Sequence, residues 1–250
     1  MTPISVQLYS VREAAAKDFV AALKKIAAIG YKGVEFAGLH NHTPQEIRKV
    51  LDELGLVASS AHTALPTPEK AAEIIETAQA LGYNWIITGK GGKDFETLDG
   101  LKKAADEFQA AAARLPKSMS LGYHNHWWEM NKFDGRLGLD LFLEKAPAVF
   151  SQVDVYWACN FGQVDVPKFV ADHKGRIPCL HLKDGPLVQG QPHTAVGKGK
   201  MNIPPIVKAA DPKLLKWLIV ELDSCATDMM QAVEDSYRYL VSSGLGEGKR

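Results

Sequence analysis

The chain has 250 residues, of which 46% are hydrophobic and 23% charged, and its 29 basic and 29 acidic residues cancel to a formal net charge of zero. This composition is typical of a globular protein, and zero net charge argues against binding to nucleic acid or to an acidic membrane surface. Three cysteines without a Cys-x-x-Cys pair argue against a disulfide scaffold or a structural zinc finger.

The N-terminus has no basic segment followed by a long apolar run, and no stretch of the chain approaches the ~20 apolar residues needed to cross a bilayer. We therefore expect a cytoplasmic protein without a membrane partner. The sequence contains no linker, low-complexity segment or shift in composition, so we expect one domain over residues 1–250.

Short β-rich runs alternate with helical patterns along the whole chain. Strands are predicted at residues 4–9, 33–38, 56–62, 84–88, 119–125, 149–156, 177–182 and 217–222. Helices are predicted at residues 14–29, 44–54, 67–82, 96–114, 138–145, 165–172, 203–210 and 228–242. Eight strand–helix units in a chain of this length predict an α/β fold of the (β/α)8 TIM barrel type. A doubly wound open sheet is the alternative, but its Gly-x-Gly-x-x-Gly fingerprint is missing after the first strand.

Helix ends are marked by particular residues. Gly30, Gly55 and Gly82 each follow a predicted helix, at the position where a left-handed backbone commonly ends one. Thr43, followed by Pro44 and Glu46, has the pattern of a capping box that starts a helix. The last residues, 244–250, are expected to fray.

Polar residues of metal-ligand type stand at the carboxyl ends of the predicted strands, where TIM barrels carry their sites. They are Glu35, His62, His124, Asn125, His126, Asp154, His181, Lys183, Glu221 and Asp223. Apolar residues precede most of them, and a carboxylate drawn into such surroundings is costly unless something compensates its charge. A divalent cation would do so, and mixed Asp, Glu and His ligands suit Mn, Fe, Zn, Co or Mg. Asp154, His181 and Glu221 make the strongest case, because each stands in the same register of a different late strand.

Other residues have weaker signals. A lone strand histidine such as His62 is more often a hydrogen-bonded core residue than a ligand, and His193 is expected to be exposed in a polar loop. The backbone amides of residues 197–200, a segment that includes Lys200, could hold a phosphate or a sugar hydroxyl. The Trp157 ring could stack on a sugar or pack under the barrel rim.

The chain resembles the sugar phosphate isomerase/epimerase group of xylose isomerase-like TIM barrels, which is related to the AP endonuclease family 2. The matching segments are QLYSVR (7–12), GYKGVEFAG (30–38), SSAHT (59–63), GYHNHWWEM (122–130), DVYWA (154–158), GRIPCLHLKDG (175–185), VGKGKMNIPPI (196–206) and VELD (220–223). Together these segments extend over nearly the whole chain.

The resemblance implies one divalent metal, often Mn, held by His124, Asp154, His181 and Glu221. Many relatives have Glu where this chain has His124, so Glu129 could instead reach back, or three protein ligands and a water could suffice. The resemblance further implies that Glu221, His62, Lys183, His126 and Glu35 take part in catalysis at the pocket. We also expect Trp157, Asn125 and Lys200 to contact the substrate.

The implied function is a metal-dependent isomerase or epimerase that acts on a small sugar or sugar derivative through an enediolate. A lyase or dehydratase acting on a keto-glycoside or inosose-like substrate is the main alternative, because a neutral His124 removes one candidate base. An AP endonuclease is disfavoured by the neutral charge and the single apparent ligand set. A non-enzymatic sugar-binding barrel is a fourth option. The oligomeric state stays open, with a homodimer among the options.

Overall fold

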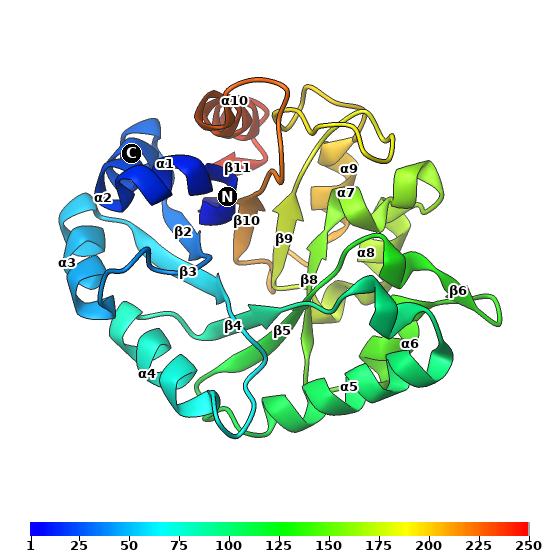
Figure 1. The fold of residues 1–250 in the computed structure, drawn as a ribbon. Helices are drawn as coiled ribbons and strands as arrows, with labels where there is room; N and C mark the ends of the chain where they lie inside the picture. The colour runs from blue at the N-terminus through cyan, green and yellow to red at the C-terminus, as the bar shows by residue number, and fades with distance from the viewer. Residues whose placement is uncertain (250) are drawn as a thin grey trace.

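The computed structural model describes residues 1–249, which form a closed barrel of parallel strands surrounded by helices (Figure 1). Each barrel strand pairs with the next one along the chain, and the last pairs with the first to close the barrel. The eight barrel strands are β1 (Thr2–Gln7), β2 (Gly33–Phe36), β3 (Val57–His62), β4 (Trp85–Thr88), β5 (Ser120–His124), β8 (Phe150–Asp154), β9 (Cys179–Leu182) and β10 (Trp217–Val220). The predicted single-domain (β/α)8 TIM barrel is confirmed.

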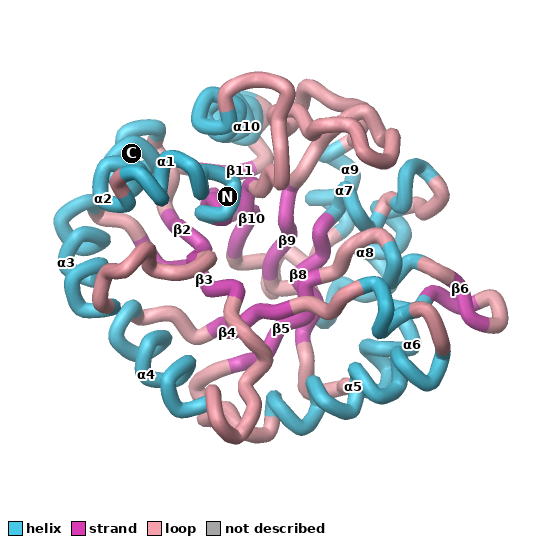
Figure 2. Tube along the Cα trace, in the orientation of Figure 1, coloured by secondary structure: helices cyan, strands magenta, loops and turns pink. Residues whose placement is uncertain are grey.

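Helices cover the outside of the barrel, as Figure 2 shows by their cyan ring around the magenta strands. The α-helices are α1 (Arg12–Lys17), α2 (Phe19–Ile29), α3 (Pro44–Leu54), α4 (Ala71–Leu81), α5 (Leu98–Ala112), α6 (Gly138–Lys145), α7 (Val155–Ala158), α8 (Val166–His173), α9 (Ile203–Ala209) and α10 (Met229–Ser242). Short 3₁₀ segments are η1 (Leu8–Val11), η2 (Gly92–Phe95), η3 (Trp128–Met130), η4 (Asn160–Gly162) and η5 (Lys174–Arg176). Strands β6 (Lys132–Phe133) and β7 (Arg136–Leu137) form a separate hairpin after β5. Within residues 1–249, no helix is both long and apolar enough to span a bilayer.

The predicted helix caps are confirmed. Gly30 ends α2 with φ +116°, and a side chain there would collide with Tyr237, because a Cβ would lie 2.4 Å from its hydroxyl. At the start of α3, the Thr43 side chain accepts a hydrogen bond from the Glu46 amide, and the Glu46 carboxylate accepts one from the Thr43 amide. These local bonds set the helix ends and thus the lengths of the strand–helix connections.

Two predicted helices differ from the structure by more than a shift of one or two residues at an end. The helix expected over 14–29 is interrupted at Asp18, whose backbone is extended and whose carboxylate accepts a hydrogen bond from Ala21 at the start of α2. The helix expected to begin at Thr67 begins at Ala71, because the intervening residues form a turn whose amides bond back to the Thr67 carbonyl. In both cases a side chain or turn that competes with helical bonding decides the boundary.

Five predicted strands, those over 4–9, 33–38, 119–125, 149–156 and 217–222, end one or two residues earlier than expected. For the first and the fourth of these, a side-chain hydrogen bond at the mouth of the barrel explains the early end. β1 stops at Gln7, whose side-chain oxygen accepts a hydrogen bond from the Tyr9 amide and turns the chain into η1. β8 stops at Asp154, whose carboxylate accepts a hydrogen bond from the Trp157 amide and starts α7. A polar side chain caps the following helix at each place, which is why the apolar pattern alone overestimates the strand.

The C-terminal segment is ordered as far as it is described, so the expected fraying is wrong there. Gly246–Glu247 forms β11, which pairs in parallel with β1 outside the barrel. The Lys249 amide donates a hydrogen bond to the Gly30 carbonyl at 2.8 Å. Residue 250 of that expectation lies outside the described residues.

The barrel interior is polar near its carboxyl-terminal mouth, whereas the layer between strands and helices is apolar. Along β8 and β9, Val153 and Leu180 belong to the apolar core, while Gln152 and His181 on the same strands are fully buried and polar. Bulky aliphatic side chains usually fill this interior in TIM barrels. Buried polar groups are costly without partners, so their arrangement marks the place to examine for a site.

Candidate metal centre

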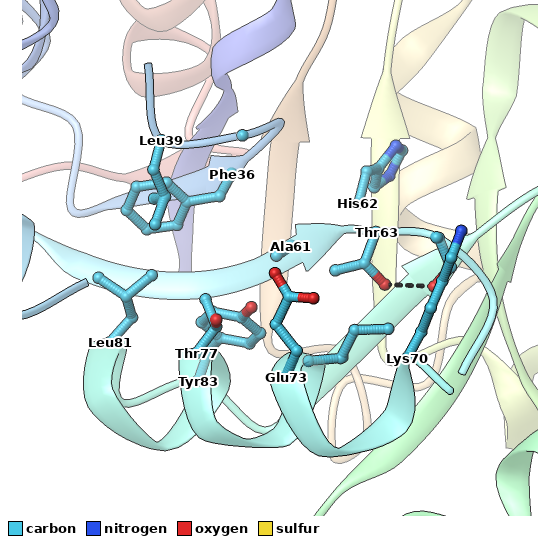
Figure 3. A pocket seen from close by; sticks show the side chains of 13 residues that line it. Phe36, Leu39, Ala61, His62, Thr63, Lys70, Glu73, Thr77, Leu81 and Tyr83 are labelled. Carbon is cyan, nitrogen blue, oxygen red and sulfur yellow. Dashed lines mark hydrogen bonds between the residues drawn. The ribbon is translucent and has the colours of Figure 1, made fainter. Parts of the chain in front are cut away.

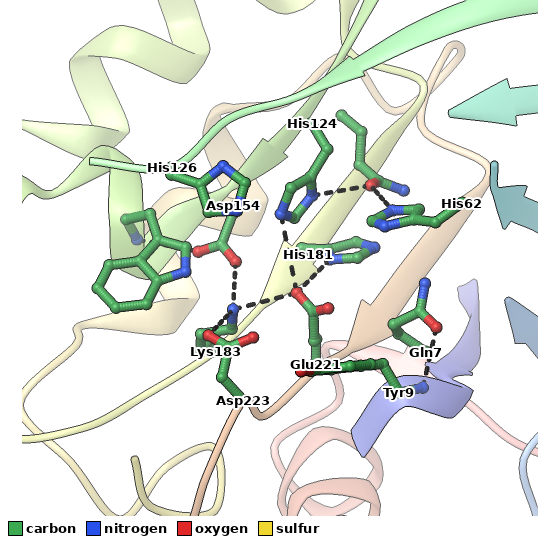
Figure 4. A network of polar contacts seen from close by, with 12 residues as sticks. Gln7, Tyr9, His62, His124, His126, Asp154, His181, Lys183, Glu221 and Asp223 are labelled. Atoms are coloured by element: carbon green, nitrogen blue, oxygen red, sulfur yellow. Dashed lines mark hydrogen bonds and ion pairs between the residues drawn. The ribbon is translucent and has the colours of Figure 1, made fainter. Parts of the chain in front are cut away.

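Four predicted ligands come together at the mouth of the barrel (Figure 4). His124 and Asp154 end β5 and β8, His181 lies in β9, and Glu221 directly follows β10. All four side chains are buried, and one ligand atom from each lies within 4.8 Å of the others. Two imidazoles and two carboxylates form a donor set that fits a divalent transition-metal ion. The buried Asp154 Oδ2 has the Lys183 ammonium 2.9 Å away as its charged partner.

The His181 ring lies between two carboxylates. Its Nε2 is 2.6 Å from Glu35 Oε1, and its Nδ1 is 2.9 Å from Glu221 Oε2. Burial opposes a charged ring, but these two carboxylates raise the pKa of His181 to about 10, so both nitrogens carry protons in the metal-free protein. Because Glu35 holds the Nε2 proton, Nδ1 is the atom that can bind a metal after losing its proton.

Glu35 lies below the ligands, fully buried in the barrel. Its carboxylate accepts hydrogen bonds from Gln7 at 2.8 Å, Ser60 at 2.5 Å and Gln152 at 2.7 Å, in addition to the His181 contact. Burial alone would raise the pKa of Glu35, but His181 and His62 lower it to about 2. Glu35 thus holds the His181 ring in place through its contact with Nε2.

Gln152 determines which nitrogen of His124 faces the other ligands. Its Nε2 must point at Glu35, because a carboxylate only accepts hydrogen bonds. Its Oε1 therefore accepts from His62 Nε2 at 2.8 Å and from His124 Nδ1 at 3.0 Å. Burial, and then the neighbouring His181, hold the pKa of His124 well below its usual value. Neutral His124 thus keeps a free lone pair on Nε2, which faces Glu221 Oε2 at 3.9 Å.

The Lys183 ammonium lies among three carboxylates. Its Nζ is 2.9 Å from Asp154, 3.1 Å from Glu221 and 2.8 Å from Asp223, and it lies 5.2 Å from the centre of a Trp157 ring. Burial opposes the charged form, but Asp154 and the other two carboxylates raise the pKa of Lys183 well above its usual value. For Glu221, burial alone would raise the pKa, but the positive charges of Lys183 and His181 bring it well below its usual range.

A second group of ligand-type residues, His62 with His124 and His181, is less suited to one ion. The rings of His62 and His181 are stacked, with an interplanar angle of 3°. Because the lone pair of a ring nitrogen lies in the ring plane, the lone pairs of parallel rings do not converge on a single ion. The set of His124, Asp154, His181 and Glu221 is therefore the better candidate.

Glu129 and Asn125 have bonding partners away from the ligand set. The Glu129 carboxylate is fully buried and accepts hydrogen bonds from the Tyr123 hydroxyl at 2.7 Å and the His126 amide at 2.8 Å. The Asn125 side chain is bonded to the backbone of Asp154 on the neighbouring strand. It is His124 that completes the group of four, while Asn125 and Glu129 hold the strand ends in place.

A cavity of about 500 Å³ opens beside the ligand set. Its walls include Tyr9, His62, Lys90, His126, Trp128 and Asp223, together with two of the ligands, His124 and Glu221. The His126 and Trp128 rings stack on each other with centroids 4.3 Å apart. The cavity is large enough for a small molecule whose polar groups reach the ligands while its body contacts aromatic surface.

A second cavity of about 410 Å³ lies between β3 and α4 (Figure 3). Phe36, Ala61 and Leu81 give it an apolar lining, with Lys70 and Glu73 contributing charged groups. These strand residues belong to the outer apolar layer, opposite to the inward-facing Glu35 and Ser60. His62, at the end of β3, lines both this cavity and the cavity at the mouth of the barrel, so the two cavities meet at that residue.

The glycine-rich segment after β9 does not offer free amides. The amides of Gly197, Gly199 and Met201 all donate to the buried carboxylate of Asp184, each at 3.0 Å. The expectation that residues 197–200 could bind a phosphate is therefore wrong, because an internal carboxylate takes that place. Lys200 is exposed on this segment and is not among the residues that line the mouth cavity.

Sequence reasoning missed several partners of the ligands. Gln7, Ser60 and Gln152 are ordinary strand residues whose polarity gives no signal of which carboxylate they contact. His193, expected to be exposed, is buried, and its Nδ1 accepts a hydrogen bond from the Asp223 amide at 3.3 Å. The available signal was that polar residues such as Gln152 and Asp154 stand at alternate positions of the same strand and therefore point to the same side, into the barrel.

The chain belongs to the family of xylose isomerase-like TIM barrels, because the model of that family matches residues 23–242. This match confirms the resemblance that the sequence motifs indicated. A search of curated protein sequences gave no match.

Solved structures show the same fold at low sequence identity. A sugar phosphate isomerase/epimerase from Parabacteroides distasonis is 23% identical, with a TM-score of 0.79 over 98% of this chain and 96% of its own. An AP endonuclease, family 2, from Brucella melitensis is 13% identical, with a TM-score of 0.73 over 97% and 99%. An IolI protein with a zinc atom is 11% identical, with a TM-score of 0.70 over 97% of each chain.

Proposed function

We propose that this protein is a divalent-metal-dependent isomerase or epimerase that acts on a small sugar or sugar derivative. The observation that carries the proposal is the meeting of His124, Asp154, His181 and Glu221 beside a cavity at the mouth of the barrel. Mn is the metal we propose, with Mg, Co, Zn or Fe as the alternatives to be tested. One structural relative carries a zinc atom, which supports a metal in this fold.

The ligands and their neighbours would have distinct tasks. When bound, the cation would act as a Lewis acid that stabilises negative charge on adjacent substrate oxygens. Glu221 lines the cavity, and its contacts with His181, Lys183 and His124 all use Oε2. These contacts leave Oε1 of Glu221 available as a base. We propose that Oε1 takes the proton from the carbon next to a substrate carbonyl.

Other groups at the cavity would return the proton. His126 lines the same cavity, and the Lys183 ammonium lies 3.1 Å from Glu221. Return to the neighbouring carbon gives isomerisation, whereas return to the same carbon from the opposite face gives epimerisation. The stacked His126 and Trp128 rings would exclude water from their side of the cavity.

The second candidate is a lyase or dehydratase on a keto-glycoside or inosose-like substrate. The observation that favours it is the neutral His124, which replaces a carboxylate at the first ligand position and donates its Nδ1 proton to Gln152. Among the four ligands, Glu221 is then the one carboxylate that also lines the cavity, since Asp154 is fully buried. Elimination needs one base and one acid, so this arrangement supplies enough groups for it.

The test begins with metal binding and then follows the substrate. Purified protein is stripped with a chelator, titrated with Mn²⁺ in a calorimeter and incubated with a panel of keto-sugars in D₂O. We expect stoichiometric binding and entry of solvent deuterium into at least one sugar. The product mass then distinguishes isomers, which conserve mass, from elimination products, which do not. Failure to bind any of the named metals would overturn the proposal.

A further inference from the structure

Lys183 shares its partners with the candidate metal. Its fully buried ammonium is 2.9 Å from Asp154 Oδ2 and 3.1 Å from Glu221 Oε2, and both residues belong to the ligand set (Figure 4). Glu221 Oε2 is also the oxygen nearest to His181 Nδ1 and His124 Nε2. A fixed positive charge therefore lies against the very carboxylates that a divalent ion would need.

Asp223 pulls the same ammonium in the opposite direction. Its Oδ2 lies 2.8 Å from Lys183 Nζ, and its side chain stands at the cavity rim with 38% of its surface exposed. The Asp223 backbone is held on both sides, because its carbonyl accepts a hydrogen bond from Arg12 at 2.9 Å and its amide donates one to His193. Asp223 is thus a fixed anchor outside the group of four ligands.

We infer, resting on the proposed metal-dependent function, that Lys183 is a tethered cation that competes with the divalent metal for Asp154 and Glu221, and that Asp223 is the positioning residue that draws it away. Like charges repel strongly where water is excluded, so the lysine weakens metal binding in proportion to its closeness to the ligands. Lys183 and Asp223 together thus determine the affinity of the centre for the divalent metal. Metal binding shifts the Lys183 ammonium toward Asp223 at the cavity rim.

Two substitutions have opposite expected effects on metal affinity. Lys183→Met keeps an unbranched side chain, shorter by one atom, but removes its charge, so Mn²⁺ should bind more tightly by about tenfold or more. Asp223→Asn keeps the shape but weakens the pull on the ammonium, so Mn²⁺ should bind several-fold more weakly. Because damage to a fold does not create tighter binding, a gain in affinity is specific to the competition. In the double variant, at least half of the Asp223→Asn effect should disappear, since it acts through Lys183.

The experiment is calorimetric titration of Mn²⁺ into the chelator-treated wild type, both single variants and the double variant, with circular dichroism to check folding. Lys145→Met is the matched control, because this lysine is paired with Asp106 at 2.7 Å on the outer helices. The Mn²⁺ affinity of Lys145→Met should equal that of the wild type. If Lys183→Met fails to fold, the Asp223→Asn result still tests the inference, because unchanged or tighter binding contradicts it.

The outcomes separate this inference from the proposed function. Wild type that binds Mn²⁺ with the same affinity as Lys183→Met overturns the inference alone. An Asp223→Asn effect of equal size in both backgrounds overturns the positioning role. Binding of Mn²⁺ by Lys183→Met but not by wild type supports the competition and counts against Mn²⁺ as the metal of the wild type. Absence of binding in every folded variant overturns both proposals.

Discussion

The substitution Glu35→Gln tests the buried network most directly. Glu35 accepts hydrogen bonds from four donors, and glutamine would turn one of its two oxygens into an amino group that faces donors. The negative charge that holds the protonated His181 is lost as well. The pKa of Glu35 is lowered from 4.5 to about 2, which corresponds to about 3 kcal/mol of stability at neutral pH.

The same shift determines the pH dependence of the metal-free protein. A depressed folded pKa means that the Glu35 contribution is present above pH 4.5 and is lost as the pH falls from 4.5 to about 2. The pKa of His181 is raised from 6.5 to about 10, so its contribution is complete below pH 6.5 and is lost as the pH rises to about 10. The wild type should therefore be most stable between these two ranges.

The assay is urea unfolding with a chelator present, followed by circular dichroism at a series of pH values. We expect Glu35→Gln to lower the free energy of unfolding by about 3 kcal/mol at neutral pH and to flatten the acid side of the profile. Mn²⁺ affinity should fall by about 10- to 100-fold, since the partner of a ligating histidine is lost. The control is Glu144→Gln, whose exposed ion pair with Arg136 should be worth less than about 1 kcal/mol. An unchanged profile and unchanged affinity would refute the network as described.

Three further substitutions test separate parts of the structure. Asp154→Asn should lower Mn²⁺ affinity by more than about 100-fold while the protein stays folded, and calorimetry that finds wild-type affinity would remove Asp154 from the ligands. Gln152→Leu removes the acceptor of the His124 Nδ1 proton, so the proton can move to Nε2 and Mn²⁺ affinity should fall by about 10- to 100-fold. An unchanged Mn²⁺ affinity in calorimetry would show that Gln152 does not determine the His124 tautomer. Asp184→Asn places an amino group against backbone donors and should cost about 2–4 kcal/mol in thermal unfolding, whereas a loss below about 1 kcal/mol would contradict its structural role.

The fold was predictable from the chain because local patterns repeat. Alternating strand and helix periods, glycines at helix ends and the Thr43 capping box are each decided within a few residues, and they indicate the (β/α)8 order directly. Where the two helices differ from the prediction, a competing local bond was responsible. Asp18 is an example, since its carboxylate starts a new helix in the middle of a continuous helical pattern.

Three candidate ligands, Asp154, His181 and Glu221, also followed from the sequence, because parallel strands place their carboxyl ends at one rim. His124 as the fourth ligand came from the family resemblance, with Glu129 left as an alternative. What the sequence left undecided was which polar groups would become neighbours. Glu35 and His181 are 146 positions apart, and their contact at 2.6 Å depends on the closure and stagger of the barrel. The position of Lys183 among three carboxylates has the same origin, because strand alternation specifies only that a side chain points inward. Distances and charge balance inside the barrel are properties of the closed sheet, so only the tertiary structure decides whether these side chains form a candidate metal centre.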